Sequence, residues 1–225
     1  MICDLNEGYA IYRPRYILPD YNVYIEKGCK FLELPAPKNL DDVLDGLLIL
    51  YSHVPSITTF PVYIGRLDVL LDPFITDEEQ DYIKIKRFLN HVDKTVPDSF
   101  CHANIGPYDT KAGRLILKAV IELEAPTPNM TIRYDKSKTS REFAELAAKA
   151  CLLVSKPSFA NDAYYISDLG EQYGIASCYN ALPECGGAYT LTRLRLGTIA
   201  RACKTVDEMV NELLPRVAKC ALSTM

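Results

Sequence analysis

The sequence contains no tryptophan, only three histidines, and neither of the two common glycine-rich phosphate loops. His53, His91 and His102 are not spaced like metal ligands, and no two cysteines have CxxC spacing. These absences argue against the familiar zinc sites and nucleotide-binding enzymes, and we expect no bound metal.

An excess of positive charge and long apolar runs are also missing. Twenty-five basic residues stand against 29 acidic ones, giving a net charge of -4 and no basic cluster that would follow a phosphate backbone. Apolar runs such as residues 47–51 are far too short to cross a bilayer, and the first residues do not resemble a secretory signal. We therefore expect a cytoplasmic protein that binds neither nucleic acid nor membrane, and its eight widely spaced cysteines fit reduced thiols.

What is present is the composition of a globular protein, with 48% hydrophobic and 24% charged residues. A helix is predicted from Asn39 to near His53, and another over residues 110–123. Three Thr-x-x-Glu capping boxes predict helix starts at Thr76, Thr139 and Thr205. Short β-type runs lie between them at residues 60–65, 130–134 and 174–178. Helices alternating with short strands favour an α/β fold with parallel strands, and the small number of strands indicates that part of a sheet or barrel is missing.

The segment at residues 156–189 combines the features expected of a site. Cys178 ends an apolar run and is followed at once by loop residues, so it is either a side chain delivered to a site or an inert core thiol. Cys185, beside two glycines, is a second cysteine whose participation stays open. Asn161 and Asp162 fit a helix cap or Asx turn. No histidine lies near Cys178 in sequence to act as a base for an ordinary thiolate nucleophile.

Four stretches in order resemble the glycyl radical enzyme superfamily, which includes pyruvate formate-lyase. They are GRLDVLLDPF (65–74), PTPNMTIR (126–133), PSFAND (157–162) and YGIASC (173–178). The segments SCYNALP and GGAYTLTRLRLG are most similar to sequences of the YjjI family.

The resemblance implies part of a glycyl radical enzyme type α/β barrel. Residues 1–225 would form a single partial barrel domain, with a Tyr/Pro-rich extended segment at 1–38 and the barrel segment at 39–225, which carries the cysteine loop near 178. The glycyl radical domain is absent from this sequence, so we expect the chain alone to be inactive. The complete protein would be a lyase or acyltransferase-like enzyme of anaerobic metabolism.

The same resemblance implies roles for individual residues and partners. Cys178 would relay a hydrogen atom as a thiyl radical, and four residues would bind a small-molecule substrate: Asn180, Asn161, Asp162 and Arg133. The resemblance implies that no cofactor is bound. The glycyl radical would be installed by a separate activating enzyme that uses S-adenosylmethionine and an iron-sulfur cluster, and the superfamily also allows a homodimer.

Two departures from the superfamily limit the reaction. Asn180 stands where dehydratases carry a glutamate, and an amide cannot act as a general base. Ser177 stands where pyruvate formate-lyase carries a second cysteine. Both radical dehydration of the usual kind and acyl transfer are therefore disfavoured. Two other classes stay open, a non-catalytic binding or assembly module and an ordinary cysteine-dependent enzyme.

Overall fold

The computed structural model describes residues 16–57, 62–95, 101–124, 128–176, 180–188 and 194–223. The chain divides into a large unit, residues 14–187, and a small unit formed by residues 1–13 and 188–225. Whether the chain acts as one partial barrel domain stays a prediction.

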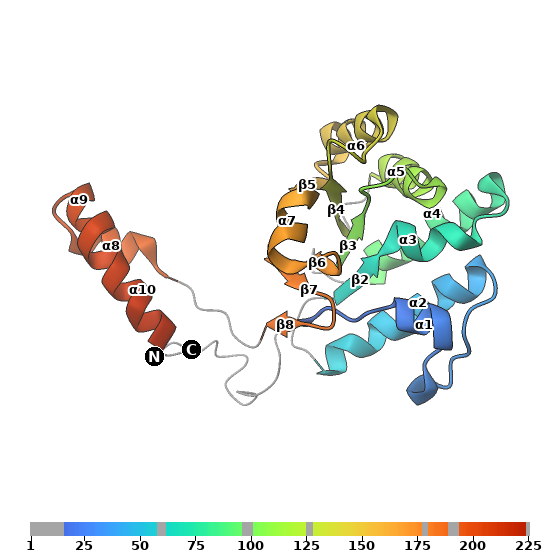
Figure 1. The fold of residues 1–225 in the computed structure, drawn as a ribbon, viewed down its shortest axis with the longest axis horizontal. Coiled ribbons are helices and arrows are strands. Elements are labelled where there is room, and N and C mark those ends of the chain that lie inside the picture. Colours follow the sequence, from blue (N-terminus) through green and yellow to red (C-terminus); the bar gives the residue numbers. More distant parts are fainter. Residues whose placement is uncertain are drawn as a thin grey trace. The chain divides into compact units, whose positions relative to one another are not determined.

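A parallel four-stranded sheet in the order β2-β3-β4-β5 lies at the centre of the large unit (Figure 1). Its strands are β2 (Val62–Arg66), β3 (Cys101–Ile105), β4 (Asn129–Tyr134) and β5 (Ser158–Asn161). The helices that precede and connect them are α2 (Leu40–Ile57), α3 (Leu67–Leu71), α4 (Glu78–Thr95), α5 (Lys111–Leu123) and α6 (Arg141–Val154), with a 3-10 turn η2 (Asp72–Phe74) after α3. The predicted α/β fold, with helices alternating with short parallel strands, is confirmed and is consistent with a partial barrel.

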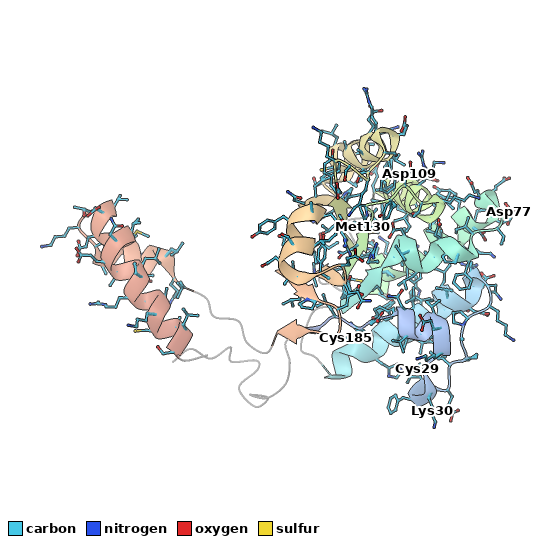
Figure 2. The ribbon with its side chains drawn as sticks, viewed as in Figure 1. Cys29, Lys30, Asp77, Asp109, Met130 and Cys185 are labelled. Carbon is cyan, nitrogen blue, oxygen red and sulfur yellow. The ribbon has the colours of Figure 1, made fainter. Side chains whose placement is uncertain are left out.

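The two faces of the sheet differ in chemistry. Successive side chains of a strand point to opposite faces. Ala103, Ile105 and Ile132 lie on the face that joins the main hydrophobic core, together with helix residues such as Leu115 and Phe143. Figure 2 marks Met130, which belongs to the same core.

The other face carries polar side chains that are nonetheless buried, and we call it the polar face. Its members are Tyr63, His102, Asn104, Thr131 and Arg133, with exposed fractions of 1%, 4%, 0%, 3% and 2%. Because buried polar groups are unfavourable unless they are hydrogen-bonded, this face must be covered by something that supplies partners.

Local capping explains where the helices begin. Thr110 caps α5 by accepting from Gly113 N at 3.0 Å, which confirms the predicted start. The starts predicted at Thr76 and Thr139 are each one residue early. Asp77 accepts from Glu79 N at 3.1 Å, and Ser140 accepts from Phe143 N at 3.1 Å. Thr139 is engaged elsewhere, since its hydroxyl accepts from Asp135 N at 3.1 Å.

After β5 the chain forms helix α7 (Asp162–Leu169) and an antiparallel hairpin of β6 (Tyr173–Ala176) and β7 (Asn180–Pro183). The two strands pair from Tyr173 opposite Pro183 to Ala176 opposite Asn180. In Figure 1 the hairpin and α7 lie on the opposite side of strands β3–β5 from helices α4, α5 and α6.

The N-terminal part described begins with β1 (Tyr16–Ile17), which pairs with β8 (Gly187–Ala188). Next to this pair, Leu18 N donates to Gly186 O at 2.9 Å and Cys185 N donates to Leu18 O at 2.7 Å. Helix α1 (Asn22–Lys27) and the 3-10 turn η1 (Lys30–Leu32) follow, inside the segment expected to be extended.

From residue 196 onward, the small unit is mainly helical. It contains α8 (Leu196–Ala202), α9 (Val206–Glu208), a π-helical turn η3 (Met209–Leu213) and α10 (Leu214–Ser223). Thr205 caps α9 by accepting from Glu208 N at 3.1 Å, so the third predicted start is confirmed. Within the described ranges, no helix is long and apolar enough to cross a membrane.

Candidate active site

The hairpin β6–β7 covers the polar face of the sheet through contacts to its main chain. The side-chain amide of Asn104 donates from Nδ2 to Ile175 O at 2.9 Å, and its Oδ1 accepts from Ile175 N at 2.7 Å. Asn104 thus pairs with β6 as a neighbouring strand would. The Asn104 side chain thus provides hydrogen-bond partners for both the N–H and the C=O of buried Ile175. These two bonds fix the position of β6 over β3.

Arg133 of β4 holds the start of the hairpin in the same manner. Its Nη1 donates to Tyr173 O at 3.2 Å and its Nη2 donates to Glu171 O at 3.1 Å. The guanidinium carbon also lies 3.9 Å from the centre of the Tyr173 ring, a cation–π geometry. The planar fork of arginine suits this arrangement, because several donors are presented at once from one rigid group.

The charge of Arg133 is balanced by Asp162, the first residue of α7. Arg133 Nε donates to Asp162 Oδ1 at 2.7 Å, with side-chain exposures of 2% and 0%. Tyr173 Oη also donates to Asp162 Oδ1, at 2.8 Å, and Lys138 Nζ lies 3.4 Å from Oδ2. Burial alone would raise the pKa of Asp162, but the hydrogen bonds from Arg133 and Tyr173 outweigh it and hold that pKa below its ordinary value. The carboxyl is therefore ionised at neutral pH.

The hairpin approaches the sheet so closely that Gly174 has no room for a side chain. A Cβ at Gly174 would overlap Tyr63 Oη and would lie 2.8 Å from Leu18 Cδ2. Tyr63 thus packs directly on the β6 backbone.

Of the predicted site residues, Cys178 lies outside the described residues, in the connection between β6 and β7. Asn180 is the first residue of β7, and its backbone pairs with Ala176. Asn161 caps α7 by accepting from Tyr164 N at 3.2 Å, which confirms the helix-cap interpretation. Arg133 and Asp162 are brought together as a buried ion pair. Substrate binding by these residues stays a prediction.

Cys185 occupies the turn between β7 and β8, where Figure 2 labels it. It is exposed and has a positive φ of 64°. The position in a turn is that of an ordinary loop cysteine, and participation of Cys185 in the chemistry stays a prediction.

His102 belongs to the polar face and is 4% exposed. Burial, together with the nearby charge of Lys156, lowers the pKa of His102 to about 4, so its imidazole is neutral at pH 7. The alternative of an ordinary cysteine-dependent enzyme needs this or another histidine within reach of Cys178 and stays a prediction.

Sequence reasoning did not find three residues that shape the site, Tyr63, Asn104 and Glu184. A signal was present for Asn104, because polar His102 and Asn104 alternate with apolar residues along 101–105, which is typical of a strand with two different faces. Glu184 carried no such signal. It stands in a turn, and only the fold brings its carboxylate Oε1 to 3.4 Å from Tyr63 Oη.

Other features of the described residues lie elsewhere. A groove of about 640 Å³ between α4, α5 and α6 is lined by residues such as Tyr82, Leu115 and Leu146, on the helical side of the sheet. Among the residues that the structure describes, no group of three or more His, Cys, Asp or Glu side chains is arranged to hold a metal ion.

Comparison with known proteins places this arrangement in a class. The family described as "Glycyl radical enzyme YjjI-like" matches residues 1–225. An uncharacterized protein of Haemophilus influenzae is 92% identical over 225 residues, which is 100% of this chain and 44% of that protein. The uncharacterized protein YjjI of Escherichia coli K12 is 46% identical over 218 residues, which is 96% of this chain and 42% of that protein. The chain thus spans less than half the length of these curated relatives.

The α/β unit with a hairpin on its polar face is therefore that of a radical enzyme family. The chain belongs to the YjjI-like glycyl radical enzyme family.

Proposed function

We propose that the complete protein transfers a hydrogen atom between a small-molecule substrate and a thiyl radical on Cys178. The observation that supports this most directly is the fixation of the hairpin by Asn104 and Arg133. In the sequence, Cys178 belongs to the connection between β6 and β7, and these contacts hold the strand β6 that leads to this connection. A reaction in which an atom is passed over a short distance needs this kind of positioning.

The chemistry is balanced as three transfers. A glycyl radical, which the family implies is formed by an activating enzyme, takes the hydrogen atom of the Cys178 thiol and leaves a sulfur radical. The sulfur radical takes a hydrogen atom from a substrate C–H bond, so the thiol is restored and a carbon radical forms. After rearrangement the product radical takes the hydrogen atom back from the thiol, which leaves the sulfur radical ready for the next substrate molecule.

Several partners belong to this proposal. They are an unidentified small molecule, an activating enzyme dependent on S-adenosylmethionine and an iron-sulfur cluster, and a second copy of the chain. Anaerobic, cytoplasmic metabolism is proposed with them because a carbon radical must be protected from oxygen. Asn180, Asn161, Asp162 and Arg133 are proposed to line the substrate, with Arg133 and Asp162 also supporting the hairpin.

The test uses full-length protein activated anaerobically and observed by electron paramagnetic resonance. A glycyl radical couples to its single α-hydrogen and gives a doublet. If Cys178 relays hydrogen atoms, its thiol takes deuterium from D2O and passes it to the glycine, and the doublet collapses. Cys178→Ser should keep the radical but also keep the doublet.

An unchanged collapse in Cys178→Ser would contradict the relay. The second candidate, a non-catalytic binding or assembly module, predicts that no radical forms under any activation condition. It also predicts that Cys178 can be replaced without loss of the protein's role.

A further inference from the structure

The segment of residues 65–72, which ends β2 and forms α3, contains a carboxyl group that is completely buried. Asp68 has an exposed fraction of 0%. Taking a charged side chain out of water is unfavourable unless other groups bind it, so the partners of Asp68 show what this side chain holds in place. The segment is also part of one of the four stretches that resemble the glycyl radical enzyme superfamily.

Asp68 and Asp72 bind the connection between β3 and α5. Asp68 Oδ2 accepts a hydrogen bond from Gly106 N at 2.8 Å and lies 3.4 Å from Thr110 Oγ1. Asp72 Oδ1 accepts from Ala112 N at 3.0 Å. Side chains four positions apart lie on the same side of a helix, which is why both aspartates reach this connection. Together they fix the chain from the end of β3 to the start of α5.

Gly106 is held on two sides by this segment and on a third by β4. Besides the bond to Asp68, its carbonyl oxygen accepts from Arg66 Nη2 at 3.4 Å. Gly106 has a positive φ of 82°, and a Cβ at this position would lie 3.0 Å from Arg133 O. The pairing of β3 with β4, which places Ile105 opposite Ile132, thus continues to the next residue of each strand. Gly106 therefore packs directly on the backbone of Arg133.

The Arg133 side chain in turn holds the start of the hairpin through the carbonyl oxygens of Tyr173 and Glu171, and it pairs with Asp162. A guanidinium that binds several fixed groups at once must have its backbone in one place, because its planar fork is rigid. A displacement of the Arg133 backbone would therefore weaken several of these bonds together.

The pKa of Asp68 gives a way to observe its burial in solution. Burial is the main cause that raises this pKa to about 6, and the charge of Asp72 adds to the increase. The hydrogen bond from Gly106 and the charge of Arg66 act in the opposite direction. Because the folded-state pKa lies above the unfolded value of about 4, folding disfavours the ionised form. The stabilising contribution is present below the unfolded pKa and is lost as the pH rises through about 6.

We propose that Arg66 and Asp68 are positioning residues of the site, which fix Gly106 and through it set the place from which Arg133 holds β6. The contacts run from the end of β2 to the end of β3, then to β4 and the hairpin, and every residue in them belongs to the described part of the chain. This inference goes beyond the proposed function, because it concerns the support of the hairpin and holds whether or not a radical is transferred.

Hydrogen exchange followed by mass spectrometry in the full-length protein tests the role of Asp68. Asp68→Ala removes the acceptor for Gly106 N, and we expect the peptides covering 106–110 and 171–175 to exchange about tenfold faster or more. Asp68→Asn keeps an acceptor for Gly106 N and should restore protection in both peptides nearly to that of wild type.

Gly106→Ala tests the contact between Gly106 and Arg133 separately. Its methyl group would press on Arg133 O and would be strained by the positive φ, while the side chain of Asp68 is unchanged. We expect faster exchange at 171–175 in this variant as well. If Asp68→Ala does not fold, Gly106→Ala decides the question by itself.

Val92→Ala is the control for a general loss of stability, because it shortens a completely buried side chain of α4 and removes no partner of Gly106. Equally fast exchange at 171–175 in Val92→Ala and Asp68→Ala would overturn the proposal, since the hairpin would then respond to stability alone. Wild-type protection at 171–175 in Gly106→Ala would overturn it too.

The dependence of stability on pH is a second measurement. In urea unfolding, the midpoint of wild type should fall relative to that of Asp68→Asn as the pH rises from about 4 through about 6, because only wild type carries the buried carboxyl that ionises. A midpoint difference that stays the same over this range would contradict the buried contact between Asp68 and Gly106.

Discussion

The Asn104 side chain binds Ile175 through both its donor and its acceptor, at 2.9 and 2.7 Å, so that a single residue of β3 replaces a neighbouring strand for β6. Since both residues are buried, water cannot take over either hydrogen bond. This pair connects the rigid sheet to the hairpin on which the proposed chemistry depends.

Replacing Asn104 by Leu should release the hairpin. The variant leaves Ile175 N and O without partners, and each buried unpaired group is expected to cost about 1–3 kcal/mol. Hydrogen exchange followed by mass spectrometry should show faster exchange in the peptide containing Ile175, with the sheet peptides nearly unchanged. Asn104→Asp keeps the acceptor for Ile175 N and should lie between Leu and wild type. Equal protection in all three proteins would contradict the pairing.

Gly174→Ala should be destabilising for a steric reason that a second change removes in large part, since Tyr63 makes the two closest contacts and Leu18 Cδ2 the third. Its methyl group would overlap Tyr63 Oη, and overpacking of this type is expected to cost about 1–3 kcal/mol. Combining it with Tyr63→Ala removes the overlapping atom, so the effects of the two substitutions should be strongly non-additive in urea unfolding of the full-length protein. Simple additivity would show that Gly174 and Tyr63 do not meet. Gly197→Ala, where a Cβ would meet nothing within 4 Å, is the control.

Asp162→Asn should destabilise the protein by about 3–5 kcal/mol, because it leaves the buried charge of Arg133 without its counter-ion. The folded-state pKa of Asp162 is lowered, so its ionised form contributes fully above the unfolded pKa of about 4. The contribution is lost as the pH falls through the lower folded-state value. The stability difference between Asp162→Asn and wild type should thus be constant near neutrality and narrow only in acid. Urea unfolding at several pH values measures this, and a difference that narrows already near neutral pH would contradict the ion pair.

Asp77→Ala should weaken the start of α4 by about 1 kcal/mol, because the Asp77 side chain accepts from two amides of the first turn. Thr76→Ala should have a smaller effect, since the contact of Thr76 in this cap is made by its backbone N to Asp81 Oδ2, at 2.8 Å. Thermal unfolding of both variants separates the two cap positions. The reverse order would support the cap predicted from the sequence.

Features that depend on interactions between residues close in sequence could be predicted, and features that depend on distant residues could not. Local signals located most elements: Thr110 and Thr205 cap the expected helices, and the apolar run at 173–176 is a strand. Thr139 and Ser140 are adjacent candidates for the cap of α6. Thr139 is not the cap because its hydroxyl accepts from Asp135 N. The Thr-x-x-Glu pattern could not predict this because it does not include Asp135.

The site depends on contacts between residues distant in sequence. Asn104 and Ile175 are 71 positions apart, and Tyr63 and Glu184 are 121 positions apart. No local pattern states that an asparagine in a strand will bind the backbone of a hairpin so far away. The resemblance to the superfamily predicts that Arg133 and Asp162 are site residues. The structure adds that they form an ion pair with each other.

The hairpin is recognised by its peptide groups, and this has a consequence for how the family can diversify. Asn104 and Arg133 bind carbonyl oxygens and an amide of residues 171–175, none of which depends on the side chain at those positions. Apart from Tyr173, whose phenol binds Asp162, and Gly174, which has no room for a side chain, the side chains of the hairpin can therefore be exchanged during evolution while its location is preserved. Residues such as Ser177 and Asn180 can then differ between enzymes that act on different substrates. A new substrate specificity would not require a new arrangement of the sheet and hairpin.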